Sequence, residues 1–271
     1  MTIAELQRTA KMLRLDTMES IFASGDGHAA PSMSIAEILT VLYFEVMNIR
    51  PTEPRWQQRD RFVLSKGHAC PILYAALARK GYFSLDELTR LRMAEGLLQG
   101  HPEMKTPGID SVSGSLGNGL AVATGIALGC KIQKQDNYTY AIIGDGEMQE
   151  GLVWEAAINA ASHQLGRLIV FSDCNNYQSG GHVTDMTSLY PVSDKWQAFH
   201  WHVQHVNGHD IPALLEAIEA AKNVPDRPSL IECQTVKGKG ISFMENNNAW
   251  HKRVPTQDEM DIIRRELEVT A

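Results

Sequence analysis

The sequence contains few cysteines, and none of them forms a closely spaced pair. Only four occur among the 271 residues, and no Cys-x-x-Cys motif of the redox or metal-binding kind is present. Isolated cysteines are typical of reduced thiols in a cytoplasmic protein rather than of a disulfide framework. The four, which we expect in or near the core, are Cys70, Cys130, Cys174 and Cys233.

Long apolar runs and a basic charge balance are absent as well. No apolar run approaches the roughly 20 residues of a transmembrane helix, and no basic region followed by an apolar core marks a signal peptide near the N-terminus. The net charge of −7 argues against nucleic acid as a default partner. We also find no internal repeat, low-complexity tract or linker. We therefore expect one domain over residues 1–271, with neither a membrane nor a nucleic-acid partner.

Apolar periodicity predicts strands that alternate with helices along the whole chain. This alternation is typical of an α/β fold with a doubly wound, mainly parallel sheet and helices on both faces. Two capping boxes, Ser34 with Glu37 and Ser84 with Glu87, are predicted to begin helices. The predicted strands span residues 61–64, 138–143, 168–171, 201–206 and 230–236. The main predicted helices span residues 3–23, 34–47, 71–79, 120–132, 151–164, 212–221 and 257–267.

Two polar segments that directly follow predicted strands are the most informative feature of the sequence. Gly144-Asp145-Gly146 follows the strand at 138–143, and Asn175-Asn176 comes after the next strand along the chain. The helix between them completes one strand–helix–strand unit, whose two strands should be parallel neighbours. Asp145 and Asn175 are then expected at adjacent carboxyl ends, where ligands bind in open α/β sheets.

This pair of segments has the chemistry of a magnesium–diphosphate site. The carboxylate of Asp145 and the amide oxygen of Asn175 are hard donors, and a diphosphate would help to complete six-fold coordination of Mg²⁺. Gly146 has no Cβ to obstruct an approaching diphosphate. The N-terminus of the helix predicted from Gly151 also favours a nearby anion.

Residues 144–157 (GDGEMQEGLVWEAA) resemble the thiamine-diphosphate signature in the form found in transketolases. Three further segments resemble transketolase motifs and occur in the same order: Ser65-Lys66-Gly67-His68, Gly100-His101-Pro102-Glu103 and Ser113-Gly114-Ser115-Leu116-Gly117. The resemblance covers nearly all of the chain. It implies the diphosphate-binding domain of a transketolase, with thiamine diphosphate and Mg²⁺ as cofactors.

The resemblance also implies which residues bind the cofactor. His68 would contact the diphosphate, and Tyr177 would add its backbone carbonyl to the two metal ligands. Gly114 and Leu116 would hold the aminopyrimidine ring through backbone groups. Ser115 replaces the proline that the family usually has between them, which leaves the backbone groups in place.

Further residues are implied on the substrate side. His101 would reach substrate hydroxyls, and His28 occupies the position of a family histidine, although the Pro-Gly that usually follows is absent. His251 would approach both diphosphate and substrate. A histidine beside a glycine is more often a turn residue, but four at successive strand–helix connections favour a site. We expect the remaining six histidines to be structural or at the surface.

Two acidic residues lie near the start of the helix predicted from Gly151. The resemblance implies that Glu150 lies at a subunit interface and connects neighbouring active sites. Glu147 is expected only to interact favourably with the helix dipole.

Thiamine chemistry needs one group that the sequence does not contain in recognisable form. A glutamate at the aminopyrimidine ring activates the cofactor, and in transketolases it comes from a separate pyrimidine-binding domain. The resemblance therefore implies a partner chain, a C-terminal pyrimidine-domain subunit, in an α2β2 assembly. The two chains together would transfer a two-carbon ketol unit from a ketose phosphate to an aldose phosphate.

Two other functions are compatible with parts of the sequence. The α subunit of a 2-oxo acid dehydrogenase first component also carries the Gly-Asp-Gly and Asn elements, and a catalytically silent regulatory partner would need neither metal ligand. The positions of His28, His68 and His101 and the spacing to Glu150 favour the transferase. The sequence does not identify the ketose donor or the aldose acceptor.

Overall fold

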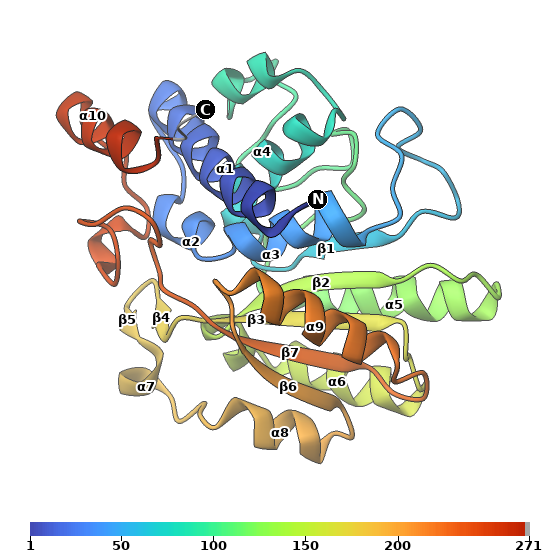
Figure 1. Cartoon of the computed structure of the whole chain (residues 1–271). Helices are drawn as coiled ribbons and strands as arrows, with labels where there is room; N and C mark the ends of the chain where they lie inside the picture. The colour runs from blue at the N-terminus through green and yellow to red at the C-terminus, as the bar shows by residue number, and fades with distance from the viewer. Residues whose placement is uncertain (269–271) are drawn as a thin grey trace.

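The computed structural model describes residues 1–268, which are built around a five-stranded sheet (Figure 1). Neighbouring strands are all parallel, and their order is β1-β2-β3-β7-β6. The predicted parallel α/β fold is therefore confirmed, including the side-by-side placement of β2 and β3. The strands are β1 (Arg61–Leu64), β2 (Thr139–Gly144), β3 (Leu168–Cys174), β6 (His202–Asn207) and β7 (Ser229–Gln234).

Helices cover both faces of this sheet (Figure 1). The α-helices are α1 (Ile3–Ser24), α2 (Ala29–Met33), α3 (Ala36–Val41), α4 (Cys70–Lys80), α5 (Asn118–Ile132), α6 (Gly151–Ser162), α7 (Val183–Met186), α8 (Val192–Ala198), α9 (Ile211–Lys222) and α10 (Gln257–Glu266). A π-helical turn, η1 (Leu42–Val46), and four 3₁₀ turns, η2 (Gly67–Ala69), η3 (Leu85–Arg90), η4 (Gly146–Gln149) and η5 (Asn248–Trp250), complete the helical structure. None of the helices within residues 1–268 has the length and apolarity to cross a membrane.

Alternating side chains of the strands divide the core into two halves. Phe62, Tyr140 and Phe171 point to the face that packs against α1, α3, α4 and α9. Val63 and Val170 point to the opposite face, which α5, α6 and α8 cover. Successive strand residues face opposite sides of a sheet, so a strand buried on both faces is apolar throughout.

A third apolar cluster lies beyond the end of the sheet. Met18 and Ile21 of α1 pack there with α2, Trp250 and α10. This packing brings the segment that precedes His251 against the segment that follows His28, although more than 200 residues separate them in the sequence. Two of the expected site segments are therefore held together by an apolar core of their own.

The start of α5 approaches the end of β1 very closely. A Cβ on Gly119 would lie 2.5 Å from the backbone Cα of Ser65, a contact that real side chains do not make. Glycine at this position lets the turn before α5 lie against the segment from Ser65 to His68.

The capping box predicted at Ser34 is wrong, because other partners take its side chains. At the other box Ser84 does cap the 3₁₀ turn η3, but Glu87 does not return the hydrogen bond. The Ser34 hydroxyl donates to Asp173 (2.7 Å), and Glu37 binds Arg14 instead of capping a helix. The predicted helix at 34–47 is divided into α3 and the π-helical turn η1. At the second box, Ser84 accepts from the Asp86 amide, while the Glu87 carboxylate pairs with Arg90.

Three short elements between β3 and β6 were not predicted: a hairpin, the helix α7 and the helix α8. A two-stranded hairpin, β4 (Tyr177–Gln178) with β5 (Gly181–His182), follows β3 directly. Helix α8 then packs on β6 and places the buried Trp196 in the core. All three elements are too short for their apolar residues to form a recognisable period.

The buried ion pair of Arg14 with Glu37 provides a test of the core. Both side chains are almost completely buried, and the guanidinium makes two hydrogen bonds of 2.7 Å to the carboxylate. Arg14→Met should lower the free energy of unfolding by about 3 kcal/mol, because the buried Glu37 carboxylate would lose its guanidinium partner and keep only the contact with His209. Urea unfolding of the two proteins measures the difference. Arg90→Met, which breaks a largely exposed pair, is the control and should cost less than about 1 kcal/mol. Equal losses in the two variants would contradict the role given to burial.

Candidate active site

One cavity of about 490 Å³ lies at the carboxyl ends of β2 and β3. It collects residues from segments that are distributed over most of the chain, and every site residue expected from the sequence lines it. These residues are His28, His68, His101, Gly114, Leu116, Asp145, Gly146, Glu150, Asn175, Tyr177 and His251.

The expected metal ligands lie at the inner end of the cavity, directly after two paired strands. Gly144 of β2 is in register with Asp173 of β3, so Asp145 and Asn175 follow at neighbouring strand ends. The Asp145 carboxylate accepts hydrogen bonds from the Gly146 amide (2.7 Å) and from the Asn176 amide. Asn176 has a φ of 61°, and asparagine tolerates this left-handed conformation better than most residues.

The donor set at this end suits a hard divalent cation. The Asn175 amide nitrogen donates to Asp173 (3.1 Å), and its oxygen accepts from the Tyr177 amide (3.0 Å), which orients that oxygen. Burial and the nearby Asp173 raise the pKa of Asp145 to about 7. A bound cation would stabilise the ionised carboxylate against both effects. Carboxylate, amide and carbonyl oxygens are ligands that fit Mg²⁺.

Glycine at position 146 leaves room for a ligand, and it is also needed for close packing of the hairpin. A Cβ at this position would lie 2.8 Å from Cβ of Gln178 in β4. The hairpin therefore closes over the Gly-Asp-Gly turn only because the residue is glycine. Tyr177 secures the hairpin on the other side, because its hydroxyl donates to the Asn246 carbonyl (2.8 Å).

Three of the four expected histidines form a triangle of imidazole rings. The ring centroids of His28 and His68 are 5.1 Å apart, and both lie 5.5 Å from the ring centroid of His251. Burial and neighbouring positive charges lower the pKa of His28 to about 4, of His251 to about 3 and of His68 to about 2. The three rings are therefore neutral at pH 7, and each has one N–H donor and one acceptor. The His101 side chain is exposed at the mouth of the cavity, and its partial loss of hydration there, together with the positive charge of Arg92, lowers its pKa.

Two lysines in the cavity wall were not identified from the sequence. Lys66 is ion-paired with Asp173 and donates to the Pro31 carbonyl (3.0 Å). Lys237 donates to Asn248 (2.6 Å) and to His251 Nδ1 (3.0 Å), and burial together with Lys66 lowers its pKa to about 8. Lys66 stands at the variable position of the Ser-x-Gly-His element, so the motif gave no reason to select it.

Glu147 has a different role from the interaction with the helix dipole that the sequence predicts. Its carboxylate is buried and accepts from the Ser65 hydroxyl and from the amides of Gly117 (2.8 Å) and Gly144 (3.0 Å). It therefore joins the turn before α5 to the ends of β1 and β2.

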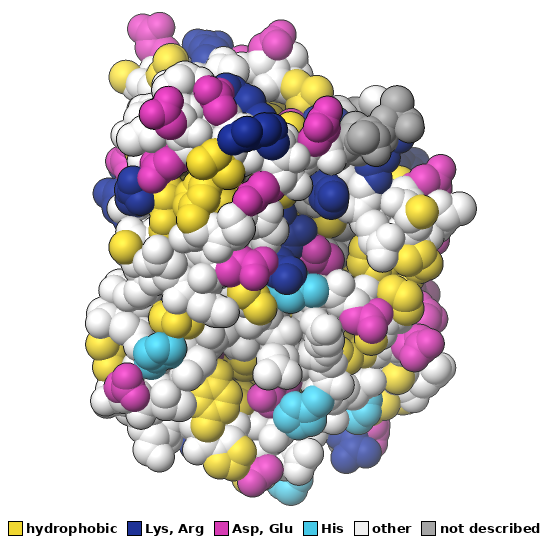
Figure 2. Space-filling view, turned by 60° about the vertical axis from the view of Figure 1, so that its left-hand side comes forward, with side chains coloured by type: hydrophobic (Ala, Val, Ile, Leu, Met, Phe, Trp, Pro, Cys, Tyr) yellow, Lys and Arg dark blue, Asp and Glu magenta, His cyan; other side chains and the backbone are white. Residues whose placement is uncertain are grey.

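The outer rim of the cavity is exposed and partly apolar. Glu150 is exposed there, and a Cβ on Gly117 would lie 3.0 Å from its Cβ. Leu116, which lines the cavity, is 37% exposed, and its close sequence neighbours Val112 and Val122 are exposed by 61% and 41%. On the face shown in Figure 2, acidic and basic side chains are interspersed, so that no field of one sign covers it.

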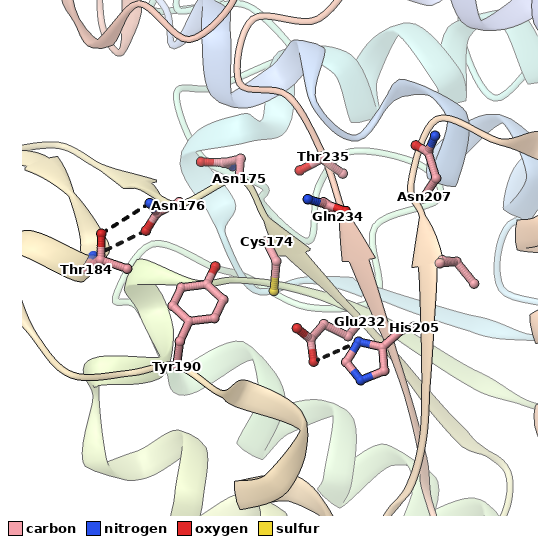
Figure 3. A pocket seen from close by; sticks show the side chains of 11 residues that line it. Cys174, Asn175, Asn176, Thr184, Tyr190, His205, Asn207, Glu232, Gln234 and Thr235 are labelled. Atoms are coloured by element: carbon pink, nitrogen blue, oxygen red, sulfur yellow. Dashed lines mark hydrogen bonds and ion pairs between the residues drawn. The ribbon is translucent and has the colours of Figure 1, made fainter.

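A second cavity, of about 600 Å³, lies on the other side of Asn175 (Figure 3). His205 of β6 and Glu232 of β7 lie side by side in its lining, with His205 Nδ1 3.5 Å from a carboxylate oxygen. The Tyr190 hydroxyl, in the wall between the two cavities, is 3.4 Å from Asp145. Among the described residues, the lining of this second cavity contains no lysine or arginine, so it lacks the positive charge that a diphosphate requires.

The fold and the first cavity define a thiamine-diphosphate-binding domain of the parallel α/β type. The family model described as "Transketolase, thiamine diphosphate binding domain" matches residues 5–270. The chain belongs to the transketolase family, and this makes it a component of a transferase.

The proteins that are similar to this chain differ in length: some are about as long as it is, and others are more than twice as long. It is 44% identical to the 6-deoxy-6-sulfo-D-fructose transketolase subunit SqwG of Clostridium sp. (strain MSTE9), across 97% of this chain and 96% of that protein. It is 35% identical to one of the subunits of the apulose-4-phosphate transketolase of Phocaeicola vulgatus, across 98% and 95%. The transketolase structure from Campylobacter jejuni superimposes with a TM-score of 0.94 at 32% identity, across 98% of this chain but only 43% of that one. The chain thus corresponds to nearly the whole of the first two relatives and to about two fifths of the longer enzymes.

The neutral histidines should make stability depend on pH. Below about pH 6.5 the unfolded chain binds protons at His68, whereas the folded chain does not, because the pKa falls from 6.5 to about 2 on folding. The free energy of unfolding should therefore decrease as pH falls from 6.5 towards 4, by up to about 1.4 kcal/mol per pH unit for each such histidine. Above pH 6.5 the contribution should be constant.

Denaturant unfolding at several pH values measures this slope. His68→Asn should flatten it, because asparagine does not titrate. His163→Asn, at the exposed end of α6, is the matched control for the substitution itself. If the slope of the His68 variant equals that of the unmodified chain, His68 is not neutral in the fold.

Proposed function

We propose that this chain is the N-terminal, diphosphate-binding subunit of a two-chain transketolase. Together with a pyrimidine-domain subunit it transfers a two-carbon ketol unit from a ketose to an aldose. One observation carries the proposal: a single cavity combines the oxygen donors of Asp145 and Asn175 with four histidines. The length that the chain shares with relatives named as transketolase subunits supports it.

The inner end of the cavity holds the cofactors in this proposal. Asp145, Asn175 and the Tyr177 carbonyl bind Mg²⁺, and His68 binds the diphosphate. Backbone groups of Gly114 and Leu116 hold the aminopyrimidine ring. When bound, thiamine diphosphate supplies a carbon nucleophile and an electron sink for cleavage of the bond next to a ketone.

The histidines position the substrate and hold its protons. A neutral imidazole both donates and accepts, so His28 and His251 can each bind a sugar hydroxyl or carbonyl oxygen without a full charge. His101, exposed at the mouth, is placed for the hydroxyls of the donor or the acceptor. Burial keeps the rings of His28 and His251 neutral. Neutral donors and acceptors suit the uncharged hydroxyl groups of a sugar.

The partner subunit covers the open side of this cavity. It supplies the glutamate that activates the cofactor and the arginines that bind the anionic end of the sugar. The apolar rim around Leu116 and Val122 is the surface that it buries, and Glu150 lies beside that surface. An α2β2 assembly, with Glu150 connecting neighbouring sites, follows the arrangement implied by the family.

The donor in this proposal is a ketose with a terminal anionic group. The two subunit relatives are named for 6-deoxy-6-sulfo-D-fructose and for apulose 4-phosphate, which carry a sulfonate and a phosphate. The sulfonated ketose is the first donor to test, because the relative named for it is 44% identical over nearly the whole chain.

The chain should be inactive alone and active with its cognate partner subunit. The assay measures ketol transfer with thiamine diphosphate and Mg²⁺ in excess, for the purified chain, the purified partner and their one-to-one mixture. 6-Deoxy-6-sulfo-D-fructose, apulose 4-phosphate and xylulose 5-phosphate serve as donors. Full activity of the single chain would contradict the two-chain architecture. Oxidation of a 2-oxo acid with an electron acceptor, in place of ketol transfer, would support the dehydrogenase alternative.

Asp145→Ala should weaken binding of Mg²⁺–thiamine diphosphate by the assembled enzyme by at least about tenfold, because a charged ligand to the metal is lost. Calorimetric titration measures the affinity, and far-UV circular dichroism shows whether the fold is retained. Asp226→Ala removes an exposed carboxylate from the turn before β7 and is the matched control. Unchanged affinity in the Asp145 variant would overturn its assignment as a ligand.

A further inference from the structure

Three loops that are far apart in the sequence carry the histidines expected on the substrate side. In the first of them Asp26 lies two positions before His28. Its carboxylate pairs with cations from the other two loops: Oδ2 is 3.3 Å from Arg92 Nη2, and Oδ1 is 3.5 Å from Lys252 Nζ. A single carboxylate therefore joins all three. We call these segments the histidine loops: residues 25–28, 92–101 and 251–252.

Arg92 connects this carboxylate to the loop that ends at His101. Its guanidinium lies against Gly100, because a Cβ on Gly100 would be 2.6 Å from Arg92 Nη1 and would displace it. Arg92 has a φ of 63°, and its amide donates to the Leu98 carbonyl (2.8 Å). An arginine in this left-handed conformation is uncommon and costs free energy, and such residues are frequent at functional sites. Packing on Gly100 and the pair with Asp26 are interactions that can offset this cost.

Lys252 connects the same carboxylate to the loop of His251, which it directly follows. The next residue, Arg253, has a different partner and pairs with Glu259 (2.7 Å). Of these two adjacent cations, only Lys252 therefore reaches across to Asp26.

The backbone around Asp26 is itself held firmly. The Ser24 hydroxyl accepts from the Asp26 amide (3.3 Å) and donates to the Asp26 carbonyl (2.7 Å). A Cβ on Gly27 would lie 2.7 Å from Cγ1 of Ile21 in α1. The backbone that leads to His28 thus packs directly on this helix, and the carboxylate projects from a fixed base.

The two ion pairs are too exposed to matter much for global stability. The side chains of Asp26, Arg92 and Lys252 are exposed by 35%, 36% and 53%, and such pairs contribute little to the free energy of unfolding. We expect their effect on the relative placement of the loops instead. A displacement of about 1 Å in a substrate-binding group can lower a rate by about a hundredfold, so a weak connection between loops can have a large effect on turnover.

We propose that Asp26 is a positioning residue, which holds the three histidine loops in the arrangement that binds the sugar through its ion pairs with Arg92 and Lys252. The placement of the loops is a property of the chain itself. The effect on turnover rests on the proposed function.

The placement can be tested by nuclear magnetic resonance of the full chain, without cofactor or partner. The ring centroids of His28 and His251 are 5.5 Å apart, so protons of the two rings should show a nuclear Overhauser effect. Asp26→Asn should weaken this effect, because the two loops lose their shared partner. The same substitution should shift the ring signals of His101.

The matched control for this experiment is Asp136→Asn. Asp136 forms an exposed pair with Arg167 (3.1 Å) ahead of β2, at the opposite end of the strands from the cavity, and its loss should leave the histidine signals unchanged. An unchanged Overhauser effect and unchanged His101 signals in the Asp26 variant would overturn the proposal.

Turnover can be tested in the assembly with the partner subunit, with D-xylulose as an uncharged donor. Asp26→Asn should lower kcat/KM for this donor by about tenfold, and Lys252→Met should lower it by less, since one of the two pairs remains. The double variant should equal Asp26→Asn, because Lys252 acts only through Asp26 and the two changes are not additive. Asp26→Glu, which keeps the carboxylate, should restore most of the activity.

Two variants serve as controls for these rates and should leave kcat/KM unchanged. One is Asp136→Asn, and the other is Lys239→Met, which breaks a pair with Glu245 (3.2 Å). Additive losses in the double variant, or no rescue by Asp26→Glu, would contradict the positioning role.

A direct contact of Arg92 and Lys252 with an anionic end of the sugar would give another result. The substitutions would then change kcat/KM for xylulose 5-phosphate and leave that for D-xylulose unaltered, which would overturn the proposal. If the unmodified assembly transfers no ketol unit from either donor, the proposed function is wrong. The Overhauser effect between His28 and His251 would still decide whether Asp26 places the loops.

Discussion

The carboxylate of Asp173 is the interaction on which the arrangement of the cavity depends. It is fully buried in β3 and accepts hydrogen bonds from Ser34, Lys66, Asn175 and Thr235. These donors come from four segments: the connection from α2 to α3, the turn after β1, the turn after β3 and the end of β7. Burying a carboxylate costs free energy that only good charge-assisted partners can offset. The four segments are therefore held together at the strand ends, where Asp145 and Asn175 lie side by side.

The charges around this centre are arranged for an anion. Lys66 is balanced by Asp173, whereas Lys237 donates only to neutral partners. The histidines are kept uncharged by burial, so they add hydrogen-bonding groups without adding repulsion between cations. The cavity thus has two kinds of lining: charged lysines and carboxylates lie at its inner end, and the histidines add neutral donors and acceptors.

The sequence predicted the fold well, because a strand buried on both faces is recognisable as a short apolar run. It also predicted which segments form the cavity, since the carboxyl ends of parallel strands must meet at one edge of the sheet. Lys66, Lys237 and Glu147 could not be predicted in this way. Their roles depend on partners far away in the sequence, such as Asp173 for Lys66 and Gly117 for Glu147, and no local pattern contains that information. The failure of the Ser34 cap has the same cause, because a tertiary hydrogen bond replaced a local one.

The third apolar cluster gives one part of the molecule a degree of independence. The segment around Met244 and Trp250, together with α10, packs on α1 and α2 and not between the sheet and its covering helices. A unit with its own small core can open locally at a lower free energy than global unfolding requires. His251 directly follows this unit in the sequence, so amide hydrogen exchange along residues 241–250 would report how firmly that side of the cavity is closed, separately from the stability of the sheet.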